Sequence, residues 1–168
     1  DFEWSQFLIR IGILDRELFE VQNLAFYEQY KAGTLDIQKF LDFQLKPLSR
    51  HPRKTLDEWH QQFMRESVMP MITQPARDLV KQHQAAGDVC VIITATNSFV
   101  TAPIAREFGI EHLIATEPEQ KDGEFTGRVA GVPSFREGKI TRLNSWLAER
   151  GWTLESFADS TFYSDSLN

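Results

Sequence analysis

The sequence predicts an α/β fold in which an all-helical segment precedes a parallel sheet covered by helices. Up to about residue 70, apolar residues recur at helical spacing only. After Pro70, short β-branched runs alternate with helical patterns, which is typical of parallel sheets. We therefore expect a helical domain over residues 1–70 and an α/β domain over residues 71–168.

Helix limits in the first domain follow from capping residues and helix breakers. Gly33 is expected to end one helix, and Pro47 is expected to end the next. Thr55 and Glu58 have the spacing of a capping box, so a third helix is expected to begin at Thr55. Pro70 then closes the helical domain.

Three short apolar runs in the second domain are expected to be strands, because they are too short for helices between their flanking turn signals. Helical patterns separate them, and an Asp-Gly pair at 122–123 predicts a hairpin turn. The expected strands are 89–93, 112–116 and 161–164, the hairpin arm is 125–129, and the expected helices end at Gly87, Gly109 and Arg150.

Composition argues against several classes of protein. The hydrophobic fraction of 42% suffices for a packed core, and no apolar stretch approaches the roughly 18 residues of a membrane span. The net charge of −6, with scattered basic residues, argues against nucleic acid as a partner. The single cysteine, Cys90, is expected to be a small buried hydrophobe. With no signal peptide visible, this low cysteine count favours the cytoplasm.

Polar residues follow the first predicted strand at the edge where parallel sheets bind ligands. Thr94 stands where this strand ends and a helix begins, so its hydroxyl and the next backbone N–H groups are suited to bind an anion. Thr96 and Asn97 are further candidates for substrate binding. The alternative is that Thr94 or Asn97 only caps the helix, and position alone favours capping.

Two further residues have the chemistry of a phosphate and metal site. Lys139 opens a helix, where the helix dipole disfavours a cation, and this indicates an anion nearby. Asp165 follows the last predicted strand, and its carboxylate suits a hard cation such as Mg²⁺, while Asn168, three residues on, is expected to orient that carboxylate. The alternatives are a solvated surface lysine and an aspartate that makes a turn.

Taken in order along the chain, these residues resemble the motifs of haloacid-dehalogenase phosphatases. Residues 91–96 resemble the second motif, Gly138-Lys139 the third, and residues 163–168 the fourth. The segment 122–127 is similar to the phosphoserine-phosphatase-like branch, which includes histidinol-phosphate phosphatases. The resemblance covers the whole chain and implies a Rossmann-like core with a helical cap inserted after its first strand.

The first motif of that family is absent. It consists of two aspartates separated by one residue at the end of the first strand, and no two aspartates of this chain have that spacing. The resemblance therefore implies an incomplete and inactive piece of a longer enzyme, whose first strand would lie between those ending at Thr94 and Asp165. We expect the coding sequence before Asp1 to supply it.

For the whole enzyme, the resemblance implies attack by the absent aspartate on the phosphate ester of a small metabolite. Mg²⁺ would bridge that aspartate, Asp165 and a phosphate oxygen, Thr94 would bind a phosphoryl oxygen, and Lys139 would neutralise charge. The segments 1–4 and 27–34 look like the histidinol-phosphate branch, so this substrate is favoured slightly over phosphoserine.

The cap is expected to select the substrate. Arg50 and Arg53 are candidates for an anionic group of the substrate, and Asp1 or Glu3 for an amine. The alternative, which is favoured for each residue taken singly, is that these are solvated surface charges.

Other classes of protein fit less well. A signalling receiver domain also binds a phosphoryl group with Asp, Thr and Lys, but it lacks so long a helical prefix and the hairpin. A dinucleotide-binding oxidoreductase would need a glycine-rich turn after a strand, and no Gly-x-Gly-x-x-Gly follows a strand here. A non-catalytic phosphate-binding module remains the third alternative.

Overall fold

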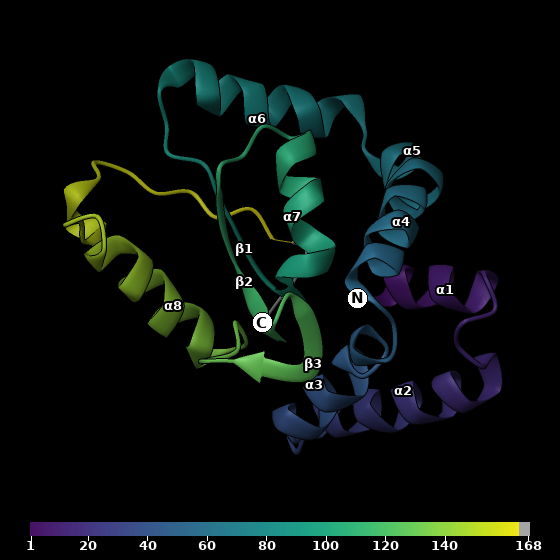
Figure 1. Cartoon of the computed structure of the whole chain (residues 1–168). Helices are drawn as coiled ribbons and strands as arrows, with labels where there is room; N and C mark the ends of the chain where they lie inside the picture. Colours follow the sequence, from purple (N-terminus) through teal and green to yellow (C-terminus); the bar gives the residue numbers. More distant parts are fainter. Residues whose placement is uncertain (165–168) are drawn as a thin grey trace.

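A computed structural model describes residues 1–164, and these form a helical half and an α/β half (Figure 1). The elements of the helical half are α1 (Phe2–Arg10), α2 (Arg16–Lys31), α3 (Ile37–Leu45), the 3₁₀ turn η1 (Leu48–Arg50), α4 (Arg53–Phe63), the π-helical turn η2 (Met64–Val68) and α5 (Met69–Met71).

The α/β half contains the sheet and the helices that cover it. Its elements are α6 (Gln74–Ala86), β1 (Val91–Asn97), α7 (Ser98–Glu107), β2 (His112–Lys121), β3 (Glu124–Ala130), α8 (Glu137–Ala148) and the 3₁₀ turn η3 (Leu154–Ser156). Within residues 1–164, none of the helices is long and apolar enough to cross a membrane.

The sheet has the order β1-β2-β3 and confirms the predicted α/β class. β1 and β2 are parallel, with Val91 opposite His112 and Ile93 opposite Ile114. β2 runs five residues beyond the predicted end at residue 116, and its second half pairs antiparallel with β3 across the predicted turn at 122–123. Helices α7 and α8 lie on opposite sides of β1 and β2, whose carboxyl ends point toward α2 and α3 (Figure 1).

The prediction of a third strand at residues 161–164 is wrong. This segment is exposed and irregular, with Phe162 exposing 70% of its surface. A strand needs a neighbour with which to exchange backbone hydrogen bonds. Within residues 1–164, β1 pairs only with β2, and the segment is held instead by a hydrogen bond between Tyr163 Oη and His83 Nε2 of α6 (2.9 Å).

Local capping explains several helix limits, and two helix ends, at Gly33 and Gly87, confirm predictions. Gly33 follows α2 with a positive φ of 72°, and Gly87 ends α6 with a φ of 81°, a conformation that glycine adopts without strain. Asp15 and Asp36 cap α2 and α3 by accepting hydrogen bonds from Leu18 N–H and Lys39 N–H.

The predicted start of α4 at Thr55 is wrong. The helix begins two residues earlier, at Arg53, after Pro52. The Arg53 N–H is a free donor of the first turn, and it donates to the Glu124 carboxylate of β3 (2.7 Å). Glu124, 71 positions away in the chain, therefore caps this helix in place of the local capping box that the sequence pattern predicted.

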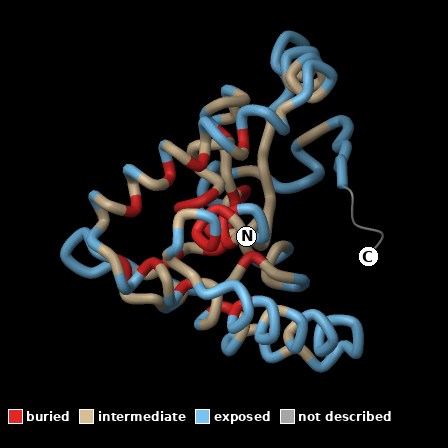
Figure 2. The backbone as a smooth tube through the Cα atoms, turned by 90° about the vertical axis from the view of Figure 1, so that its right-hand side faces the viewer, coloured by how far each residue is buried: buried red, intermediate tan, exposed pale blue. Residues whose placement is uncertain are grey.

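The main hydrophobic core joins the two halves. Buried residues cluster at the centre of the molecule, around the N-terminus (Figure 2). Rings from both halves meet there: Trp4 of α1 and Phe63 of α4 lie 5.2 Å apart, and Trp4 lies 5.7 Å from Phe99 of α7. The cluster is made of Trp4, Phe7, Leu8, Leu45, Leu48, Leu56, Phe63, Val68, Phe99, Val100 and Phe125.

His60 is the one histidine buried in this aromatic cluster among the residues described. Its ring exposes 4% of its surface, lies 5.1 Å from that of Phe99, and bonds through Nε2 to the Val100 carbonyl (3.0 Å). Burial lowers the pKa of His60 from its usual 6.5, because the charged imidazolium would lose its hydration.

This lowered pKa predicts that His60 makes stability depend on pH. Below about pH 6.5 the unfolded chain binds a proton at His60 that the folded chain resists, so the free energy of unfolding falls as the pH drops toward the lowered folded pKa. We expect urea denaturation between pH 8 and pH 5 to show this loss. His60→Phe keeps a ring but cannot titrate, so equal pH dependence in both proteins would contradict the assignment.

Candidate active site

The carboxyl end of β1 is irregular. Residues 94–96 lie opposite the single residue Ala115 of β2, which makes a bulge. Bulges turn side chains out of the regular alternation and are frequent beside active sites. Here the Thr94 hydroxyl accepts a hydrogen bond from the Thr96 N–H (3.2 Å), and Thr94 is half-buried.

Asn97 ends β1 and begins α7. Its Oδ1 caps the helix by accepting from the Val100 N–H (3.2 Å), as the alternative interpretation stated, and it exposes only 4% of its surface. Its Nδ2 donates to the Asp1 carboxylate (3.3 Å). Capping thus fixes the Asn97 side chain, and the amide holds Asp1 beside the end of β1.

Lys139 lies in the first turn of α8, where a tight turn over residues 135–138 leads into the helix. The Gly138 N–H donates to the Phe135 carbonyl (2.9 Å), and the Lys139 N–H donates to the Arg136 carbonyl (2.9 Å). A Cβ on Gly138 would lie 2.0 Å from the Pro133 carbonyl oxygen. Only glycine therefore allows the loop before α8 to fold onto its first turn, directly before Lys139.

Arg136, the first central residue of this turn, has φ 47° and ψ −122°. These are the angles of a type II′ turn, in which this position is normally glycine. A side chain held in such a region costs about 1–3 kcal/mol, and strain of this size is concentrated at functional sites.

One cavity of about 2080 Å³ connects the end of β1 with the helical half. Ile93 and Ala95 line it together with Lys139, and so do Asp1 and Thr116, whereas the predicted residues Thr94, Thr96 and Asn97 are not among the lining residues. Aromatic residues of the helical half form the facing wall: Phe26, Tyr27 and Tyr30 of α2 and Phe40 of α3. The end of β1, Lys139 and the helical half therefore border one space.

Another part of this cavity is apolar. Small-molecule pockets have volumes of about 300–1,000 Å³, so the cavity is larger than a metabolite requires. Val91 of β1 lines this part, as do Leu79, Val80, Leu143 and Leu147 of α6 and α8. Cys90 also lines the cavity and is only half-buried, and its partial burial raises the pKa of the thiol.

A polar bridge fixes α8 against β2 and α7. Arg142 donates to the Glu117 carboxylate of β2 (3.4 Å) and to the Val132 carbonyl (3.1 Å). The other carboxylate oxygen of Glu117 accepts from the Ser98 hydroxyl at the start of α7 (2.5 Å). Because Arg142 follows Lys139 by one helical turn, this bridge also fixes the direction from which Lys139 enters the cavity.

Arg50 and Arg53 are not among the residues that line this cavity. The Arg53 guanidinium donates to Asp57 (2.9 Å) and to Gln120 of β2 (2.9 Å), and it packs over the Phe125 ring. For Arg53 this geometry favours a structural contact between α4 and the hairpin. Arg50 is exposed at the end of η1, which fits a solvated surface charge.

Asp165 and Asn168, the predicted metal-site residues, lie outside the residues that the structure describes. Within residues 1–164, no group of three His, Cys, Asp or Glu residues is arranged to hold a metal ion.

Arg136, Tyr30 and Thr116 border the cavity but were not among the candidates from the sequence. Thr116 is fully buried, and its hydroxyl accepts from the Ser134 N–H (3.1 Å). Arg136 stands three residues before Lys139, and a search around the lysine motif would have found it. Tyr30 is reached only through the folding of α2 over the sheet, which no local pattern shows.

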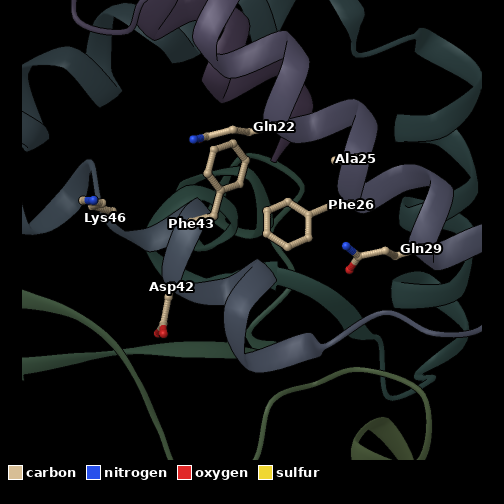
Figure 3. Close-up of a pocket in the computed structure, with 7 residues that line it drawn as sticks. All are labelled: Gln22, Ala25, Phe26, Gln29, Asp42, Phe43 and Lys46. Carbon is tan, nitrogen blue, oxygen red and sulfur yellow. The ribbon is translucent and has the colours of Figure 1, made fainter.

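A smaller cavity of about 410 Å³ lies between α2 and α3 (Figure 3), and Phe26 lines both this cavity and the larger one. The Phe26 and Phe43 rings lie 5.3 Å apart at its centre. Gln22, Gln29, Asp42 and Lys46 surround them. None of the residues singled out in the sequence lies here.

Comparison with known proteins gives a family and close relatives. The model of the haloacid dehalogenase-like hydrolase family matches residues 1–168. A histidinol-phosphatase of Neisseria meningitidis is 48% identical over the whole of this chain and 76% of its own length.

Solved structures share the fold. A Bordetella pertussis protein of unknown function is 49% identical, with a TM-score of 0.91 over 99% of this chain and 75% of its own. A substrate-bound phosphoserine phosphatase is 19% identical, with a TM-score of 0.59 over 91% of this chain and 67% of its own. At that identity, the second likeness concerns the fold alone.

The close approach at Gly138 predicts that Gly138→Ala destabilises the protein. The added methyl group would meet the Pro133 carbonyl, and the loop must shift, at a cost of about 1–3 kcal/mol in the free energy of unfolding. Urea denaturation measures this loss. Glu137→Ala, one residue earlier on the same helix, should cost about 0.5 kcal/mol through the helix dipole. Equal losses in the two variants would show that the contact is unimportant.

Proposed function

Because the chain belongs to the haloacid dehalogenase-like hydrolase family, we propose that it acts as part of a phosphatase for the phosphate ester of a small metabolite. The observation that carries the proposal is the shared cavity. Lys139 borders the same space as the irregular end of β1, where phosphate-binding hydroxyl and N–H groups would be expected.

Histidinol phosphate is the preferred substrate of this proposal. The 48% identity to the Neisseria histidinol-phosphatase extends over the whole chain, so it includes the helical half that faces the site. The aromatic wall of α2 and α3 also suits a substrate with a planar ring better than phosphoserine, which has none.

The residues of this chain would bind and orient the phosphate group. The Thr94 hydroxyl would donate to a phosphoryl oxygen, as would N–H groups of the bulge other than that of Thr96, which already donates to Thr94. The Lys139 ammonium would offset charge that grows during transfer. The bridge from Arg142 to Glu117 would keep α8, and Lys139 with it, at a fixed distance from β2. Positioning of this kind is most of what phosphoryl transfer requires from a protein.

Mg²⁺ is the cofactor that the family suggests, and Asp165 is the residue proposed to bind it, with Asn168 beside it. When bound, the ion would offset negative charge on the phosphate. A cytoplasmic location stays a prediction that rests on the low cysteine content.

The nucleophile proposed for this reaction is an aspartate of the family's first motif, which the 168 residues do not contain. A strand that carried it would fit the apolar part of the cavity, because β1 has no partner on that side within residues 1–164 and apolar side chains of α6 and α8 face the gap. We therefore propose that these 168 residues alone do not turn over a phosphate ester.

The activity test adds the missing motif. The added segment is an apolar strand followed by two aspartates that are separated by one residue, and it is joined before Asp1. The extended protein is expected to hydrolyse p-nitrophenyl phosphate and histidinol phosphate, and EDTA should abolish this activity. Lys139→Ala should lower kcat by about 100-fold or more, because an electrostatic contact of the transition state is lost. The matched control is Lys81→Ala, whose lysine does not line the cavity.

The results that oppose the proposal are distinct. Full activity of Lys139→Ala would remove Lys139 from the site. Multiple turnover by the 168 residues alone would show that the first motif is dispensable. An extended protein that binds phosphate, accumulates a phosphorylated aspartate and does not release it would favour the receiver-like alternative.

A further inference from the structure

Arg136 is held between aromatic rings of both halves of the molecule. Its guanidinium carbon lies 5.7 Å from the centre of the Tyr30 ring of α2 and 5.2 Å from that of Phe135. The two rings are themselves 6.4 Å apart. A guanidinium stacked on rings presents its N–H donors at its edge, in the plane of the group.

The donors of Arg136 have no acceptor among the described residues. Arg136 is exposed, and within residues 1–164 no carboxylate or carbonyl accepts a hydrogen bond from its guanidinium, whereas Arg53, Arg77 and Arg142 each donate to one or more side chains. Arg136 also lines the large cavity, one helical turn before Lys139. Its free donors are therefore placed at the space where substrate is proposed to bind.

The backbone at Arg136 argues against a purely structural role. The residue takes a type II′ conformation that glycine adopts without strain. Folding alone would be served better by glycine there, as it is at Gly138 two residues later. An arginine in this position keeps the strain and adds only what its side chain does, which is to stack on Tyr30 and present free donors.

We propose that Arg136 determines substrate specificity by recognising the alcohol part of the phosphate ester, which carries a planar ring with a hydrogen-bond acceptor. Tyr30 and the neighbouring aromatic residues Phe26 and Tyr27 provide faces on which such a ring stacks. The edge of Arg136 donates to its acceptor atom, as an imidazole nitrogen would provide. In this proposal Lys139 binds the phosphate group, and Arg136 binds the ring. This inference rests on the proposed phosphatase function.

Equilibrium binding tests the assignment without requiring turnover. Calorimetric titration in the presence of Mg²⁺ uses the extended protein of the activity test, with the first aspartate of its added motif changed to asparagine so that no probe is hydrolysed. The three probes are L-histidinol phosphate, O-phospho-L-serine and inorganic phosphate. Arg136→Gly removes the side chain and suits the backbone. It should weaken binding of L-histidinol phosphate by about tenfold or more and leave the other two dissociation constants unchanged. Arg136→Lys keeps the charge but not the planar edge, so it should not restore the preference.

A matched control separates recognition from backbone strain. Asp122 is the other non-glycine residue with positive φ among those described (φ 53°), and it lies in the hairpin turn and does not line the cavity. Asp122→Gly and Arg136→Gly should each keep or raise the melting temperature. Asp122→Gly should leave all three dissociation constants unchanged.

Each remaining outcome decides against one of the two proposals. If Arg136→Gly weakens all three probes equally, or none of them, Arg136 does not select the ring and the inference fails, while the phosphatase proposal stands. If the extended protein with Arg136 intact binds no probe, or Lys139→Ala leaves phosphate binding unchanged, the proposed phosphate site itself fails, and the role of Arg136 fails with it.

Discussion

The aromatic core between α1, α4 and α7 is the contact on which the geometry of the site depends. One half of the molecule carries Lys139 and the end of β1, and the other half carries the ring wall of α2 and α3. Removing one large ring from such a core costs about 3–5 kcal/mol, a large part of the roughly 5–15 kcal/mol that holds a typical domain together. Trp4 and Phe99 therefore fix the two walls of the cavity in one arrangement.

The same core explains why the polar contacts around the site are few but specific. The Asn97 amide is buried at its edge and can be satisfied only by capping α7 and holding Asp1. Farther out, Glu117 joins the start of α7 to α8 through Ser98 and Arg142. Each bridge ties a helix to the end of a strand, so the position of Lys139 depends on contacts well outside the cavity.

Features that depend on neighbouring residues in the chain could be predicted from the sequence. The hairpin turn at 122–123, the end of α6 at Gly87 and the presence of a strand before α7 all follow from local propensity and burial. The predicted strand limits of 89–93 are wrong, because β1 covers Val91–Asn97 and runs through Thr94. The family, too, follows from short motifs in a fixed order, and the match over residues 1–168 confirms it.

Features that depend on distant residues could not. Glu124 replaces the expected cap at Thr55, the bulge at 94–96 exists only through its register with β2, and Arg136 occupies a turn position that residue statistics give to glycine. The expected strand at 161–164 failed for the same reason, because strand formation belongs to a pair of segments and not to one.

The open side of β1 has a consequence for how this polypeptide behaves in a crowded solution. Within residues 1–164, the second edge of β1, seven residues rich in β-branched side chains, has no hydrogen-bonded strand beside it. Such an edge is a template for any extended chain, including a second copy, and native proteins usually blunt it with charge or proline. Val91, Ile92 and Ile93 carry neither, so a polypeptide limited to these residues would be open to pairing along this edge, whereas a strand placed beside β1 would close it.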